Sequence, residues 1–158
     1  MNYFKIAKFF LYLAPFTVAI VSASTLFPFI VGKYVWFRSV VDLALLFFLL
    51  GLFLHREAGQ YETRLLKWLK LPLTIAVGAF TVVFGLAGLL GINPQMSFWA
   101  NFERGEGGLQ ILHLFLFFVL LGVLLKDKKD WGKIFLLSVV AGLFMILYGV
   151  GAGLKDTD

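Results

Sequence analysis

Long apolar runs separated by short polar segments dominate the chain. Five runs approach the ~20 mainly apolar residues that a helix needs to cross a bilayer: residues 9–31, 35–54, 71–92, 109–125 and 134–154. Period-2 alternation is absent, and an open sheet would leave backbone groups without partners in lipid. The pattern therefore predicts an all-α integral membrane protein, with about five transmembrane helices in one antiparallel bundle and residues 1–158 as a single domain.

The polar stretch between the second and third runs has a pattern of its own. At 100° per residue, its apolar and basic residues between positions 60 and 71 fall on different arcs. The apolar arc contains Tyr61, Leu65, Leu66, Trp68 and Leu69, and the other contains Thr63, Arg64, Lys67 and Lys70. We expect a short interfacial helix whose basic face meets anionic headgroups.

Composition supports a membrane protein. Hydrophobic residues make up 61% of the chain and the mean hydropathy is +0.92, whereas soluble domains are about 45–50% apolar. The absence of cysteine excludes disulfides and thiolate metal sites. The net charge of +5 lies in short segments between apolar runs, so the basic balance indicates a membrane topology and no nucleic-acid partner.

Basic residues predict the orientation of the chain. Ten of the 14 Lys and Arg residues fall before the first run, between the second and third, or between the fourth and fifth. Because basic loops stay on the cytoplasmic side, we expect a cytoplasmic N-terminus in the cytoplasmic (inner) membrane. The start also resembles a secretory signal that ends near residues 21–24, but the apolar run continues to Val31, which favours an uncleaved helix.

Charged residues in the second run form the first candidate site. Arg38 and Asp42 are four residues apart, so they can pair on one helix face. Charge inside a membrane costs ~2.5–3.5 kcal/mol on insertion scales and needs a partner or a task. One interpretation is a purely structural pair. The other is that Asp42 orients Arg38 toward an anionic ligand at the outer surface, with Lys33 adding a second positive charge.

Residues 93–108, between the third and fourth runs, form the second candidate site. They combine three aromatic residues, two acids and one Arg with three glycines; these are Phe98, Trp99, Phe102, Glu103, Arg104, Glu106, Gly105, Gly107 and Gly108. The acids are also explained by the dipole at a helix start, and Trp99 by an interfacial aromatic belt. The glycines permit close backbone approach. Arg104 remains a candidate for binding phosphate or stacking on a sugar.

Other chemical motifs are few. His113 lies one turn into the fourth run, where an interhelical hydrogen bond is expected more than catalysis. The glycines at 85–91 and 149–153 indicate close helix packing. Because zinc-ligand spacing, phosphate-loop and serine-nucleophile motifs are absent from the sequence, we expect neither a metal nor a cofactor.

Residues 27–38 and 93–107 together resemble the N-terminal part of O-antigen ligase-like membrane proteins, which are related to polysaccharide polymerases. The resemblance implies a GT-C type glycosyltransferase of lipopolysaccharide or cell-surface polysaccharide biosynthesis. Such enzymes transfer a glycan from a polyprenyl diphosphate carrier on the outer side of the membrane. It further implies that Lys33, Arg38 and Arg104 contact the diphosphate. The aromatic residues Phe98, Trp99 and Phe102 would line the lipid or sugar path, and Asp42, Glu103 and Glu106 would be orienting or structural acids.

The resemblance covers most of this chain but only a fraction of a family member. The family's large outer loop, with its arginines and catalytic histidine, has no counterpart here, so we expect no catalysis by this chain alone. A missing C-terminal portion is then an expected partner. The alternative is a non-enzymatic membrane scaffold or partner subunit. A transporter is a weaker third interpretation, because a paired inverted repeat is not evident.

Overall fold

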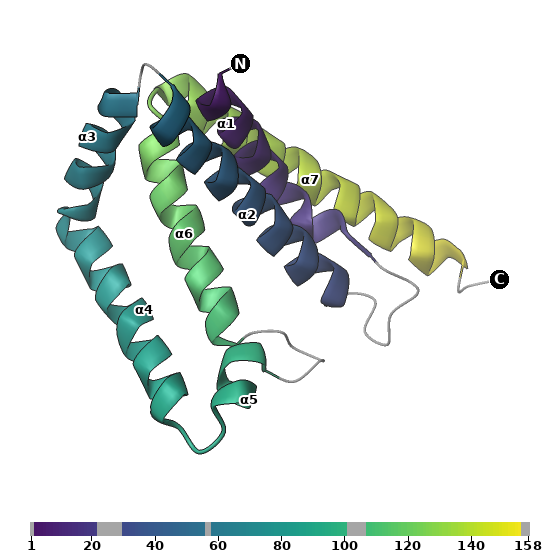
Figure 1. Ribbon diagram of the computed structural model, residues 1–158. Coiled ribbons are helices and arrows are strands. Elements are labelled where there is room, and N and C mark those ends of the chain that lie inside the picture. The colour runs from purple at the N-terminus through teal and green to yellow at the C-terminus, as the bar shows by residue number, and fades with distance from the viewer. Residues whose placement is uncertain (1, 22–29, 56–57, 101–106, 156–158) are drawn as a thin grey trace.

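The computed structural model describes residues 2–21, 30–55, 58–100 and 107–155. These residues form helices joined by short turns, without a strand. In chain order the elements are α1 (Tyr3–Leu13), the 3₁₀ helix η1 (Ala14–Ala19), α2 (Val31–Leu54), α3 (Ala58–Leu69), α4 (Pro72–Leu90), α5 (Pro94–Trp99), α6 (Gly108–Leu124) and α7 (Lys128–Lys155) (Figure 1).

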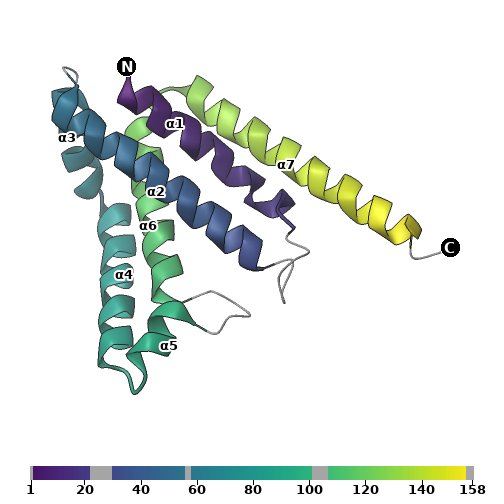
Figure 2. The ribbon, with the colours of Figure 1, turned by 45° about the vertical axis from the view of Figure 1, so that its right-hand side comes forward.

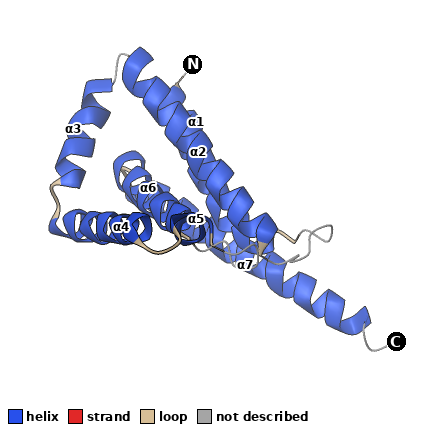
Figure 3. Cartoon of the chain, turned by 60° about the horizontal axis from the view of Figure 1, so that its bottom comes forward, coloured by secondary structure: helices blue, strands red, loops and turns tan. Residues whose placement is uncertain are grey.

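Helix α6 is the centre of the arrangement. It packs against α1, α2, α3, α4 and α5. Helices α1 and α2 lie side by side, and α7 packs mainly on η1 before its C-terminal part extends away from the other helices (Figure 2). Helices α3 and α4 lie on the other side of α6 and meet at a sharp angle (Figure 3). The helices thus form two groups that share α6, a more open packing than the single bundle that the sequence predicts.

Four of the five predicted spans coincide with helices of the structure. Within the described residues, three helices are long and apolar enough to cross a membrane: α2, α4 and the part of α7 from Lys128 to Gly151. Helix α6 is equally apolar but has 17 residues. The predicted amphipathic segment at 60–71 corresponds to α3, whose only buried residue among those described is Tyr61.

The first predicted span differs from the structure. Residues 9–31 were expected to form one helix, but α1 begins at Tyr3 and ends at Leu13, and η1 and an extended Ile20 follow. Pro15 lies in the first turn of η1. Its ring occupies the position of a backbone N–H and clashes with the carbonyl four residues earlier, so an α-helix ends before it. Residues 22–29, with the signal-like cleavage motif, lie outside the described residues.

The core lies where α1, α2, α3 and α6 meet. Phe4 is 1% exposed; its ring stacks on Tyr61 with centroids 3.7 Å apart and meets Phe48 edge-on at 6.0 Å. Gly51 makes room for this ring, because a Cβ there would lie 2.7 Å from it. In contrast, α4 and α7 leave most of their large apolar side chains exposed, as surfaces that face lipid do.

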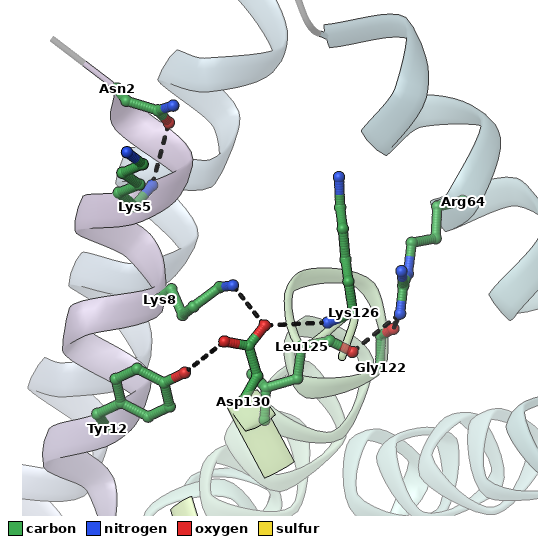
Figure 4. Close-up of polar contacts among 9 residues, drawn as sticks. All are labelled: Asn2, Lys5, Lys8, Tyr12, Arg64, Gly122, Leu125, Lys126 and Asp130. Carbon is green, nitrogen blue, oxygen red and sulfur yellow. Dashed lines mark hydrogen bonds and ion pairs between the residues drawn. The ribbon is translucent and has the colours of Figure 1, made fainter. Parts of the chain in front are cut away.

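A cluster of charged residues joins α1 to the start of α7. Asp130 accepts hydrogen bonds from Lys8 Nζ at 2.6 Å, from Tyr12 Oη at 3.0 Å and from the backbone N–H of Lys126 at 3.3 Å (Figure 4). We call these four residues the Asp130 cluster. Because Asp130 stands in the first turn of α7, its charge also complements the positive end of the helix dipole.

Beside this cluster, α3 closes the C-terminal end of α6. Arg64 donates to the carbonyl of Gly122 at 3.1 and 3.2 Å and to that of Leu125 at 2.9 Å (Figure 4). The last carbonyls of a helix have no partner within the helix, so Arg64 satisfies groups that α6 itself leaves open. Trp68 covers Gly122 so closely that any Cβ there would overlap its ring.

Candidate functional site

The two sequence segments singled out above meet in one pocket. Its volume is about 530 Å³, and its walls come from α2 and from α5 with the residues that flank it. The lining residues are Tyr34, Arg38, Asn93, Gln95, Met96, Trp99 and Ala100. We call this the Arg38 pocket. It lies at the N-terminal end of α6, where α5 packs against that helix.

Arg38 is held by groups from two helices. Its Nε donates to Gln110 Oε1 of α6 at 3.0 Å, and its guanidinium carbon lies 4.8 Å from the centre of the Tyr34 ring on α2. A guanidinium over an aromatic face is attracted by the ring's negative charge distribution. These contacts fix the cation at the pocket wall.

Asp42 lies one turn beyond Arg38 on α2 and contacts the next polar residue of α6. Its Oδ1 is 3.2 Å from His113 Nε2, and the other ring nitrogen, Nδ1, is 2.6 Å from the carbonyl oxygen of Leu109. The interhelical contact predicted for His113 is therefore confirmed. The sequence suggested that Asp42 orients Arg38; in the structure Gln110 accepts from Arg38 Nε and Asp42 contacts His113.

The opposite wall of the pocket is a short, tightly turned segment. Asn93 Oδ1 accepts from the Met96 N–H at 3.1 Å and so caps α5. At the other end, Ala100 has φ 59° and ψ −169°, a conformation that is essentially restricted to glycine and costs about 1–3 kcal/mol. Trp99, just before it, is 62% exposed. Strain of this kind collects at functional sites.

Two glycines let this wall approach α6. A Cβ at Gly107 would overlap the Phe98 backbone, and one at Gly108 would lie 2.9 Å from the Phe98 ring. The close backbone approach predicted for these glycines is therefore confirmed. Phe98 itself packs toward Gly88 of α4 and Gly108 of α6, so it anchors the wall and Trp99 lines the pocket.

The remaining predicted site residues have different positions. Lys33 lies in the first turn of α2 and does not belong to the residues that line the pocket. Phe102, Glu103, Arg104 and Glu106 lie outside the described residues. Of the predicted cations, Arg38 is thus the one that the structure places in the pocket wall.

Sequence reasoning missed Gln110 and did not single out Tyr34, Asn93 or Gln95. Gln110 left a signal: it is a polar residue inside an apolar run and stands three positions before His113, so both lie on one helix face. Tyr34 stands four positions before Arg38, the spacing of neighbours on a helix. The amides of Asn93 and Gln95 carry no sequence signal beyond their place in the loop.

The pocket combines a guanidinium with aromatic rings and side-chain amides. Arginine recognises phosphate through charge-assisted hydrogen bonds, and amides both donate and accept, so the arrangement suits an anionic group that carries a polar extension. Across the described ranges, no three His, Asp or Glu side chains come together as a metal site would need. No family model, curated protein or solved structure matches the chain.

Proposed function

We propose that this chain is a membrane protein whose Arg38 pocket binds the phosphorylated headgroup of a lipid. Following the resemblance, the lipid is a polyprenyl diphosphate that carries a glycan. The chain then is the N-terminal membrane portion of an O-antigen ligase-like glycosyltransferase on the outer side of the cytoplasmic membrane. One observation carries the proposal: the two segments that bear the resemblance line a single pocket, with Arg38 on one wall and Trp99 on the other.

The chemistry of the pocket supports a diphosphate headgroup. A fixed cation beside a diphosphate stabilises the charge that develops when it leaves the sugar. Trp99 offers a flat apolar face to a sugar ring, and the amides of Asn93 and Gln95 offer partners to its hydroxyls. In this proposal the chain supplies part of the carrier-lipid site and does not supply the catalytic groups.

A second candidate is a non-enzymatic membrane scaffold or partner subunit. Two polar contacts tie α2 to α6, namely Arg38 to Gln110 and Asp42 to His113. Such contacts between apolar helices hold bundles together without any ligand. In this reading the same residues serve assembly alone.

Binding of a polyprenyl diphosphate by the full chain in lipid nanodiscs separates the two candidates. We expect Arg38→Gln to weaken binding by about 10–100-fold, since hydrogen bonds to charged groups contribute about 1.5–3 kcal/mol. Arg38→Lys should fall between, because a point charge replaces the planar fork. Lys67→Gln is the control: it removes a positive charge from an exposed position on α3, which covers the other end of α6, and it should change binding less than threefold.

Circular dichroism and the elution volume of each variant must show an unchanged fold. With the fold intact, equal affinity of wild type and Arg38→Gln contradicts headgroup binding in this pocket and favours the scaffold. A polyprenyl alcohol of the same length, without phosphate, tests whether the pocket recognises the phosphate headgroup or only the hydrocarbon tail of the lipid.

A further inference from the structure

We infer that Asp42 and His113 form a proton-binding site between α2 and α6. The inference is independent of what the Arg38 pocket binds. Both ring nitrogens of His113 face oxygen atoms: Nδ1 is 2.6 Å from the carbonyl oxygen of Leu109, and Nε2 is 3.2 Å from Asp42 Oδ1.

The donors and acceptors of this arrangement require an extra proton. A carbonyl oxygen only accepts hydrogen bonds, so Nδ1 must carry a hydrogen. An ionised carboxylate also only accepts, so either Nε2 carries a second hydrogen or Asp42 is itself protonated. If the imidazole were neutral and the carboxylate ionised, the lone pair of His113 Nε2 would face a lone pair of Asp42 Oδ1, and the two would repel each other. In either allowed form the pair holds one proton more than a neutral imidazole plus a carboxylate.

The position of the pair in the fold explains why an extra proton is favourable. Asp42 lies near the middle of the 24-residue apolar helix α2, where an unpaired charge is costly. With the proton, the pair is neutral as a whole; without it, the pair carries one negative charge. The proton therefore offsets the charge of the acid in this span and joins α2 to α6.

Few other charges face the pair from the described elements. Arg38 and Tyr34 precede Asp42 on α2, and Arg38 contacts Gln110 one turn before His113 on α6. Helices α4 and α5, which pack on α6, carry no ionisable side chain. The charged side chains of α1 and α3 make their contacts at the far end of α6, where Lys8 meets Asp130 and Arg64 meets the C-terminal carbonyls of α6.

The two side chains differ in burial. The Asp42 side chain is 61% exposed, whereas that of His113 is 13% exposed. The carboxylate therefore lies at the surface of the helices, while the imidazole stays packed between them. Because the pair lies one turn from the Arg38–Gln110 contact, loss of the proton should loosen α2 from α6 beside the Arg38 pocket.

The chain contains two histidines, which makes nuclear magnetic resonance a direct test. We would label the full chain with ¹⁵N-histidine and ¹³C-carboxyl aspartate in detergent micelles near neutral pH. His55→Gln identifies the His113 signals and leaves the site intact. Asp42→Asn is the matched variant, since its amide can donate to Nε2 and keep the contact without the extra proton.

Two results support the site: a doubly protonated His113 ring, or a protonated Asp42 carboxyl beside a singly protonated ring. In the first case we expect Asp42→Asn to convert the ring to the singly protonated form, while His55 stays unchanged. A singly protonated ring beside an ionised Asp42 in the wild-type chain overturns the inference. Because this reading comes from the wild-type chain, it stands even where Asp42→Asn fails to fold.

Discussion

Around the C-terminal end of α6, charged side chains bind backbone carbonyls and one another, whereas around its N-terminal end polar side chains line a pocket. At the first end, Asp130 accepts three hydrogen bonds and Arg64 covers the last carbonyls of the helix. At the second end, Ala100 holds a strained backbone conformation and Trp99 is mostly exposed. The same helix thus has one end that is closed by its neighbours and one that faces a pocket of about 530 Å³.

The difference separates two kinds of polar residue in an apolar protein. Those of the Asp130 cluster satisfy one another, which is how charge is tolerated in low-dielectric surroundings. Those of the Arg38 pocket coexist with strain, which folded proteins retain mainly where it serves a function. Substitutions at the first end should therefore change stability, and those at the second should change binding more than stability.

The largest effect on stability is expected at Asp130. Asp130→Ala leaves Lys8, Tyr12 and the Lys126 N–H without their acceptor, and should lower the free energy of unfolding by about 3 kcal/mol. Unfolding in mixed detergent micelles, followed by circular dichroism, measures this change. Glu62→Gln removes an exposed acid on α3 and should stay within about 0.5 kcal/mol of wild type. Equal effects of the two substitutions would show that the Asp130 cluster does not hold α1 to α7.

A smaller loss is expected where α3 covers α6. Gly122→Ala places a methyl group against the Trp68 ring, and overpacking of this kind costs about 1–3 kcal/mol. Gly142→Ala is the control, because a Cβ at Gly142 in α7 meets nothing within 4 Å. There the higher helix propensity of alanine should add up to about 1 kcal/mol. The two substitutions are chemically identical, so the sign of the difference reports the Trp68 contact; a loss of stability in both would argue against it.

The smallest effect is expected at the pocket, with the opposite sign. Ala100→Gly removes the cost of the positive φ and should stabilise the chain by about 1 kcal/mol. Ala76→Gly, at an exposed position inside α4, should destabilise it by about the same amount. The same unfolding titration measures both. If glycine at position 100 destabilises the chain as it does at position 76, the pocket wall is not strained and backbone strain does not distinguish the two ends of α6.

Much of the fold follows from the sequence because apolar run length decides it. The runs correspond to α2, α4, α6 and α7, and periodicity finds α3. The prediction for the first run is wrong because the run stays apolar through Pro15. Hydropathy therefore does not indicate that the α-helix ends there, which the geometry of proline imposes. Run length also says little about packing, and the two-group arrangement around α6 was not predicted.

The candidate site was predicted in part. Arg38 and Trp99 stand out because a charge and an exposed aromatic residue are conspicuous in apolar surroundings. Which residue meets Arg38 depends on which helices touch: spacing within α2 suggests Asp42, but α6 brings Gln110 and His113 to the same face. One sequence without tertiary contacts cannot rank a partner on the same helix against one on another helix.

The lengths of the helices around the pocket have a consequence for the bilayer itself. At 1.5 Å per residue, the 17 residues of α6 rise about 25 Å and the 24 of α2 about 36 Å, whereas the apolar core of a bilayer is about 30 Å thick. A membrane of uniform thickness cannot match both lengths, so for α2 and α6 both to cross it, lipid next to α6 would have to thin or the helices would have to tilt. Thinning at the N-terminal end of α6 would draw headgroup phosphates down toward Arg38. Short-chain lipids should therefore bring their own headgroups nearer to the pocket than long-chain lipids do.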